Sequence, residues 1–289
     1  MSDIRYDKQE SSITLSLKHG LGENAPVLPT AHYHNTCEIC FFAHSTVRAF
    51  MQNTWYDVQD GDIVIIPQYE MHRYEYLNAD RYTRLLINFS DEYLRNMLEQ
   101  LHCPGLYTSL KATKCMHLRP RSMKFRKLYQ QAEEVLASYK LMMRRHTEES
   151  VAIFRARFFC LLCDLQPLIT EKTDTAGLSK SSECVQRIIN YIDENYTQQL
   201  TLEQLAEIAL VDKYHLCHIF KQHTGMTAVK YIHTRRIIEA EKQLLYSNRS
   251  ADAIAFAVGF TTMQHFYRVF REITGTSPGE YREKNHLKT

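Results

Sequence analysis

The chain has 289 residues, of which 44% are hydrophobic, so it is long enough to form two ordinary globular domains. It contains no run of eighteen apolar residues and its first ten residues are polar, so we expect no membrane span, no signal peptide and a cytoplasmic location. The formal net charge is only +2, so bulk charge does not by itself predict a nucleic-acid partner.

The first part of the chain, residues 11–90, has the pattern of short β-strands. Apolar and polar residues alternate from Ile13 to Leu17. Residues 56–67 combine a strand, an Asp-Gly turn and a buried strand that ends at a proline, and residues 85–89 form another short apolar run. Many short strands separated by turn signals predict a small β-barrel or jelly roll.

Two long helices follow. Apolar residues recur at helical spacing in residues 123–143 and again in residues 148–169. The second helix is apolar over much of its circumference, and such a helix needs burial on more than one side. We therefore expect it to pack on the barrel and also on a partner subunit, and we expect the protein to be a homodimer.

A small polar segment separates these helices from the rest of the chain. Residues 171–181 are the best linker in the sequence, so the predicted domains are residues 1–170 and residues 182–289. Ser181 or Ser182 is expected to cap the next helix. That helix carries an apolar stripe formed by Val185, Ile188, Ile189 and Ile192.

The eight cysteines lie mostly inside apolar runs, so in a reducing compartment they are expected to be small buried hydrophobes. Two pairs have Cys-x-x-Cys spacing. Cys37 and Cys40 lie on a predicted strand and should point to opposite faces, whereas Cys160 and Cys163 should share a helical face. A thiol sensor is one candidate function for this chain, and it would require exposed thiols of low pKa.

One pattern occurs twice near the C-terminus, in residues 212–225 and 262–275. In each copy three apolar residues at i, i+3 and i+4 define the buried face of a helix; they are Leu216, Ile219 and Phe220, then Phe266, Val269 and Phe270. Polar residues before each helix (Asp212; Thr261 or Thr262) suit the N-cap, and Gly225 and Gly275 suit the helix end. A helix over residues 229–245 would join the two units. This pattern predicts a helix-turn-helix used twice, which suits two stretches of DNA major groove.

Residues 254–282 resemble the signature of the AraC/XylS family of bacterial transcription regulators, and the first unit is similar to it as well. The matching residues are Gly259, Phe260, Phe266, Arg268, Phe270, Gly275, Pro278, Tyr281 and Arg282, then Leu202, Leu205, Ala206, Leu216, Phe220, Gly225, Tyr231, Arg236 and Ala240. The resemblance implies two recognition helices that enter successive major grooves of promoter DNA. It places the DNA-binding residues at Tyr214, Cys217, His218, Lys221, Gln264, Tyr267, Arg268 and Arg271.

The first unit departs from the family pattern at two positions. Leu210 stands where the turn often has glycine, and His218 stands where arginine is common. Histidine cannot make the bidentate contact with guanine that arginine makes. For any one of these helices, a solvated polar face is the alternative interpretation.

Residues 27–90 resemble the two cupin motifs, in which three histidines and one glutamate can hold a divalent metal. The corresponding residues are His32, His34, Glu38 and His72, and alternation along a predicted strand would place His32 and His34 on the same face. Three interpretations remain open for them: lining of an effector pocket, structural hydrogen bonding, or a metal site for zinc, iron or manganese. Tyr69 and Tyr76 depart from the usual glycine and asparagine of the second motif.

Nearby aromatic residues either line that pocket or form the barrel core; they are Tyr33, Phe42, Trp55 and Tyr56. The predicted fold is α+β, with an N-terminal cupin-like β-barrel and dimerisation helices followed by an all-α double helix-turn-helix domain. The predicted function is a ligand-responsive transcriptional regulator that senses a small metabolite such as a sugar. It needs no catalytic residue and no cofactor, and it would contact RNA polymerase if it is an activator. The alternative is a metal-dependent cupin enzyme fused to a DNA-binding module.

Overall fold

The structure is a computed structural model that describes residues 13–20, 31–51, 54–77, 82–111, 115–170 and 180–286. The chain divides into two compact units, residues 1–177 and residues 178–289. Each unit has its own hydrophobic core. Within the described ranges, no helix is both long enough and apolar enough to cross a membrane.

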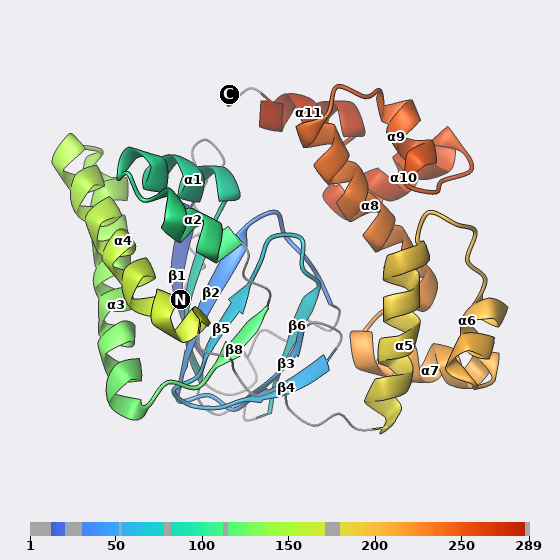
Figure 1. The fold of residues 1–289 in the computed structure, drawn as a ribbon, viewed down its shortest axis with the longest axis horizontal. Coiled ribbons are helices and arrows are strands. Elements are labelled where there is room, and N and C mark those ends of the chain that lie inside the picture. The colour runs from blue at the N-terminus through green and yellow to red at the C-terminus, as the bar shows by residue number, and fades with distance from the viewer. Residues whose placement is uncertain are drawn as a thin grey trace. The chain divides into compact units, whose positions relative to one another are not determined.

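The N-terminal unit contains two antiparallel sheets among its described residues (Figure 1). The five-stranded sheet has the order β1 (Ile13–Gly20), β7 (Tyr82–Phe89), β2 (Cys37–Ala43), β5 (Ile63–Ile66) and β8 (Met116–Leu118). The three-stranded sheet has the order β4 (Thr54–Val58), β3 (Val47–Met51) and β6 (His72–Tyr76). The expected β-rich N-terminal domain is thus confirmed, and the Asp-Gly turn connects strands of different sheets instead of closing a hairpin.

The two faces of the five-stranded sheet contact different layers, because successive side chains on a strand point to opposite faces. On β2, Cys40 and Phe42 pack toward the three-stranded sheet and share a core with its residues Val47 and Ala49. Ile39 and Phe41 pack on the other face, against the helices. Burial on both faces explains why β5 is a continuous apolar run and why β2 is apolar except at Glu38.

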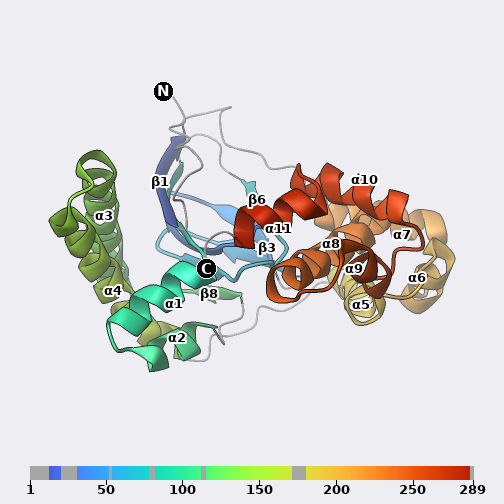
Figure 2. The ribbon, with the colours of Figure 1, turned by 90° about the horizontal axis from the view of Figure 1, so that it is seen from above.

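Four helices cover the outer face of the five-stranded sheet. They are α1 (Asp91–Gln100), α2 (Pro104–Lys111), α3 (Ser122–Arg145) and α4 (Glu148–Thr170). Figure 1 shows α3 and α4 side by side as a hairpin, and Figure 2 shows α1 and α2 from above. Their apolar faces join those of the strands in one cluster, so the helices and the sheet form one core.

The C-terminal unit consists of helices. They are α5 (Lys180–Asn195), α6 (Leu202–Ala209), α7 (Lys213–Thr224), α8 (Ala228–Tyr246), α9 (Ala251–Ala257), α10 (Met263–Thr274) and α11 (Pro278–His286). The pairs α6–α7 and α9–α10 form the two expected helix-turn-helix motifs, and α8 joins them. The six residues predicted to face inward on the two recognition helices are all buried.

The two recognition helices, α7 and α10, begin and end in the same way. Asp212 and Thr262 are N-caps whose side chains accept hydrogen bonds from backbone N–H groups of the first turn. Gly225 and Gly275 are C-caps, both at φ 76° and ψ 0°. Only glycine adopts this left-handed conformation without a steric cost, so each recognition helix ends where the sequence predicts.

Several expectations need correction. Helix α5 begins at Lys180, so Ser181 and Ser182 lie inside it and do not cap it; residues 171–179 of the predicted linker lie outside the described residues. The short strand β8 precedes the two expected long helices, and the sequence analysis did not predict it. The predicted strand that carries His32 and His34 is absent from the described residues 31–36, where only an isolated bridge pairs His32 with His72.

The expectation of buried cysteines is wrong for part of the set. Cys40, Cys115 and Cys184 are buried, whereas Cys160, Cys163 and Cys217 are exposed. Cys160 and Cys163 lie on the outward face of α4, which the sheet does not cover. Their exposure follows from helix geometry, because the sheet and α3 bury the opposite face, formed by Phe154, Phe158, Leu161, Leu162 and Leu165.

Candidate functional sites

A polar cluster lies inside the N-terminal unit, between the two sheets. Glu38 on β2 is 4% exposed, and its carboxylate accepts hydrogen bonds from Tyr74 Oη at 2.9 Å and Cys40 Sγ at 3.3 Å. His34 Nε2 lies 3.2 Å from Glu38 Oε2, and His72 Nε2 lies 3.9 Å from the same oxygen. Side chains from the segment before β2, from β2 itself and from β6 therefore converge on one buried carboxylate.

Backbone contacts orient the two imidazole rings. His34 Nδ1 lies 2.7 Å from the carbonyl oxygen of Thr36, and His72 Nδ1 lies 3.0 Å from that of Glu70. A carbonyl accepts only a donated proton, so each Nδ1 carries hydrogen and each Nε2 faces Glu38. His72 Nε2 is buried and makes no hydrogen bond. His72 Nε2 and the carboxylate are both acceptors, so a donor or a cation between them would satisfy both.

The electrostatics of the cluster are asymmetric. Burial raises the pKa of Glu38, but the hydrogen bond from His34 and the charge of Arg84 outweigh burial and hold this pKa well below its usual range. Burial lowers the pKa of His34, but its bond to Glu38 outweighs that effect and raises the pKa above 6.5. Burial lowers the pKa of His72 to about 4. Near neutral pH, Glu38 is therefore ionised and His72 is neutral, while the bond to Glu38 shifts His34 toward its charged form.

Three of the four cupin-like residues offer ligand atoms for a metal ion. The ligand atoms of His34, Glu38 and His72 all lie within 4.8 Å of one another. Two imidazole nitrogens and a carboxylate suit zinc or iron, and the bonds from both Nδ1 atoms to backbone carbonyls are the usual outer-shell support. The fourth residue, His32, pairs with His72 through two backbone hydrogen bonds of 2.9 Å, and the centroids of their rings lie 4.4 Å apart with the planes tilted by 53°.

The eight candidate DNA-binding residues lie on the exposed faces of α7 and α10; they are Tyr214, Cys217, His218, Lys221, Gln264, Tyr267, Arg268 and Arg271. Tyr214 is 87% exposed although it is large and aromatic. Arg268 Nη1 lies 3.6 Å from Glu272 Oε2, and both side chains are exposed. Exposed pairs of this kind contribute little, so the guanidinium can turn to another partner.

The loop between α5 and α6 packs against the turn of the second helix-turn-helix. Gln199 Nε2 donates to the carbonyl of Gly259 at 3.1 Å. Buried Arg236 on α8 donates to the carbonyls of Tyr196 and Gln198, both at 2.7 Å. These contacts join the two helix-turn-helix motifs through backbone atoms, which fixes one recognition helix relative to the other.

Two protein-family models match the chain. Residues 27–139 match the AraC-like ligand binding domain, and residues 205–284 match a helix-turn-helix domain. The chain belongs to the AraC family. It is a ligand-responsive transcriptional regulator with an N-terminal β-rich ligand-binding domain and a C-terminal DNA-binding helix-turn-helix domain.

Relatives of this regulator include the transcriptional activator RhaS of Escherichia fergusonii, which is 26% identical over 87% of this chain and 87% of its own length. The bifunctional transcriptional activator and DNA repair enzyme AdaA of Bacillus subtilis is 33% identical, but the match covers 49% of this chain and 66% of AdaA. Among solved structures, the C-terminal domain of AraT from Geobacillus stearothermophilus is 32% identical, with 36% of this chain and 88% of that chain covered and a TM-score of 0.35.

Sequence reasoning missed two members of the buried cluster around Glu38. Tyr74 donates to Glu38, and buried Arg84 lies over the Tyr74 ring at 5.4 Å. The signal for Arg84 was present, since it is a charged residue in the middle of an apolar strand. Of the aromatic candidates, Phe42 is fully buried in the core between the sheets and Tyr56 packs against that core, so both contribute to packing.

Proposed function

We propose that the regulator binds promoter DNA through the exposed faces of α7 and α10. The observation that carries the proposal is the pair of twelve-residue helices with equivalent caps, each of which presents polar and cationic side chains outward. Arg268 presents a guanidinium fork that suits guanine, and Lys221 suits a phosphate. His218 and the exposed Leu210 turn make the first helix a less specific reader than the second.

Substitutions on the two helices test this proposal. Arg268→Ala should cost roughly 1–3 kcal/mol of binding free energy and relax specificity at one base position. Lys221→Ala should weaken binding to all sequences and reduce the salt dependence by about one ion. Lys140→Ala, which removes an exposed charge from α3, is the matched control and should bind as wild type. Equal affinity of all three variants for the operator would contradict the proposal.

We propose that the cluster around Glu38 recognises a small polar effector such as a sugar. A hydroxyl group between His72 Nε2 and Glu38 can donate to one acceptor and accept from a further donor. This supports effector lining over purely structural hydrogen bonding, because His72 Nε2 is buried without a hydrogen bond. A divalent cation would satisfy the same atoms, so metal content separates the regulator from the cupin enzyme alternative.

Three measurements test the sensor. Glu38→Gln and His72→Ala should blunt the effector response in a promoter reporter while operator recognition persists. A structural role would instead lower the melting temperature and weaken both properties. Metal analysis of the purified protein should show no stoichiometric iron, manganese or nickel. Unchanged stability together with an unchanged response would dismiss the sensor role.

A symmetric interface through α4 would make the regulator a homodimer. The outward face of α4 is exposed and nearly uncharged along Ala152, Ala156, Cys160 and Cys163. Ala156→Glu should produce a monomer with a folded N-terminal unit, whereas Asn96→Glu on the exposed face of α1 should leave the dimer intact. Sedimentation at micromolar concentration measures both, and a wild-type monomer with and without DNA would refute the dimer.

The remaining parts of the proposal follow from promoter DNA as the partner. The regulator would act in the cytoplasm, where promoter DNA lies, and it would contact RNA polymerase if it activates transcription. It would not be an enzyme, because regulation of this kind requires binding and no chemical step. Transcription in vitro with purified polymerase, with and without the regulator, distinguishes activation from repression.

A further inference from the structure

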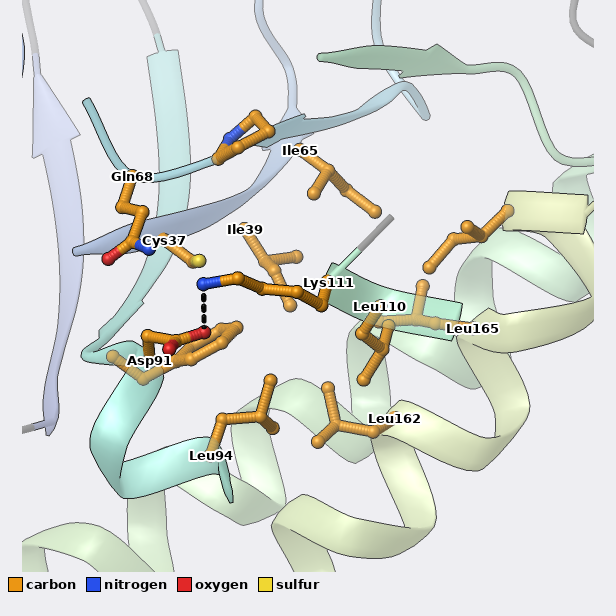
Figure 3. A pocket seen from close by; sticks show the side chains of 13 residues that line it. Cys37, Ile39, Ile65, Gln68, Asp91, Leu94, Leu110, Lys111, Leu162 and Leu165 are labelled. Atoms are coloured by element: carbon orange, nitrogen blue, oxygen red, sulfur yellow. Dashed lines mark hydrogen bonds and ion pairs between the residues drawn. The ribbon is translucent and has the colours of Figure 1, made fainter. Parts of the chain in front are cut away.

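A cavity of about 210 Å³ lies between the outer face of the five-stranded sheet and helices α1, α2 and α4 (Figure 3). It is separate from the sensor cluster. Ile39 lines this cavity, whereas the preceding residue on β2, Glu38, points to the opposite face, between the sheets. Nothing in the sensor proposal uses this space.

The cavity is apolar over most of its wall. Figure 3 shows aliphatic side chains from β2, α1, α2 and α4 that point into one space. The apolar lining consists of Ile39, Ile65, Pro67, Phe89, Leu94, Leu110, Leu162, Leu165 and Ile169. Such a wall favours an apolar molecule, because burial of apolar surface contributes roughly 25 cal/mol per Å².

One end of the cavity is polar. Lys111 Nζ lies 2.7 Å from Asp91 Oδ1, and the side chain of Lys111 is 45% exposed. Tyr107 Oη donates to both oxygens of Asp91, at 3.1 and 3.2 Å. Gln68 and Cys37 lie at the same end in Figure 3. Asp91 is therefore held without Lys111, and its carboxylate has capacity for another donor, since it offers about four acceptor positions.

We propose that this cavity binds a small uncharged molecule with an apolar body and one hydroxyl group, such as a medium-chain alcohol. The ammonium of Lys111 is a donor and the carboxylate of Asp91 is an acceptor, and one hydroxyl can accept from the first and donate to the second. The charges of Lys111 and Asp91 cancel. An anionic ligand would be repelled by Asp91, and a cationic ligand would be repelled by Lys111. A cavity of about 150 Å³ holds benzene, so this one suits a body of roughly eight non-hydrogen atoms.

Occupancy would act on α4. Leu162, Leu165 and Ile169 form one wall of the cavity, and the opposite face of the same helix carries Ala156 and Cys160. A ligand that binds the folded state stabilises the docking of α4 on the sheet by mass action. The cavity is thus a second ligand site, and it lies on the side of α4 opposite the face that we propose for the dimer interface.

Calorimetric titration of the full chain with three eight-carbon probes tests the site without DNA, so its outcome is independent of the DNA-binding proposal. We expect 1-octanol to bind with 1:1 stoichiometry, and octanoate and octylammonium to bind at least about tenfold more weakly, which corresponds to about 1.4 kcal/mol. Leu110→Phe fills the cavity and should weaken 1-octanol binding by a similar factor. Leu106→Phe makes the same change on α2 outside the cavity lining and should bind as wild type.

A charge variant keeps the test informative if Leu110→Phe fails to fold. Lys111→Met alters a half-exposed side chain and leaves the polar end negative. It should reverse the preference, so that octylammonium binds more tightly than 1-octanol. The proposal is overturned if 1-octanol does not bind up to its solubility limit, if the charged probes bind as tightly as the alcohol to wild type, or if Lys111→Met leaves the order of the probes unchanged.

Discussion

Replacement of Gly259 by alanine tests the junction between the two helix-turn-helix motifs. Gly259 has φ +97°, a backbone conformation that residues with a side chain rarely adopt. An added Cβ would lie 2.6 Å from the carbonyl oxygen of Thr197 and 2.8 Å from its Cα. Both are backbone atoms, so no side chain can rotate to make room. The loop before α6 has to move away from the second motif.

The magnitude follows from these contacts. A non-glycine residue in such a conformation costs on the order of 1–3 kcal/mol. Movement of the loop also breaks the bond from Gln199 to the Gly259 carbonyl, which contributes about 1 kcal/mol. We expect Gly259→Ala to lower the free energy of unfolding of the C-terminal unit by about 3 kcal/mol, a large part of the roughly 5–15 kcal/mol that is typical of a domain.

Two other glycines provide controls. Gly275 has φ +76° with no atom within 4 Å of an added Cβ, so Gly275→Ala should cost only the strain, about 1–2 kcal/mol. Gly279 lies in α11 with open space around it, so Gly279→Ala should stabilise by about 0.5–1 kcal/mol.

Urea unfolding followed by circular dichroism reports the helices. The single tryptophan, Trp55, reports the N-terminal unit by fluorescence and should not change. If Gly259→Ala lowers the free energy of unfolding no more than Gly275→Ala does, the packing of Gly259 against the loop between α5 and α6 is refuted.

Three further predictions concern the C-terminal unit. Arg236→Met removes two hydrogen bonds of 2.7 Å to backbone carbonyls and should cost about 3 kcal/mol by urea unfolding, with partial rescue by Arg236→Lys. Asp212→Ala removes the N-cap of α7 and should cost about 0.5–2 kcal/mol, whereas Asp212→Asn should retain stability. Burial lowers the pKa of His233 to about 4 from 6.5, so the folded state resists protonation. The contribution of neutral His233 to the free energy of unfolding should be fully present above pH 6.5 and should be lost as the pH drops toward 4. The variant His233→Gln should flatten this decline, and identical profiles of melting temperature against pH for the variant and wild type would contradict the prediction.

The C-terminal unit was predictable from sequence because its signals are local. Each cap lies within three residues of its partner, as Asp212 and Thr262 show, and each apolar trio repeats at i, i+3 and i+4. Leu210 also behaves as its position implies, since it adopts φ 57° where the family often has glycine. Such features need no knowledge of the tertiary structure.

The membership of the cluster around Glu38 was only partly predictable from sequence, because its residues come from different sheets. Glu38 on β2 meets His72 on β6, and neither the missing strand at His34 nor the contribution of Tyr74 followed from alternation. The outward exposure of Cys160 depends on which face of α4 the sheet buries. The cavity beside Lys111 depends on how six separate elements (β2, β5, β7, α1, α2 and α4) pack, and no spacing in the sequence encodes that volume.

Chemical footprinting of the major groove on a promoter fragment selected from genomic DNA tests most directly whether α7 and α10 both bind DNA. The account predicts two protected patches on one face of the duplex, separated by one helical turn, about 10–10.5 base pairs. Arg268→Ala should weaken protection only in the patch that α10 contacts. One protected patch, or two patches that Arg268→Ala weakens equally, would contradict the account.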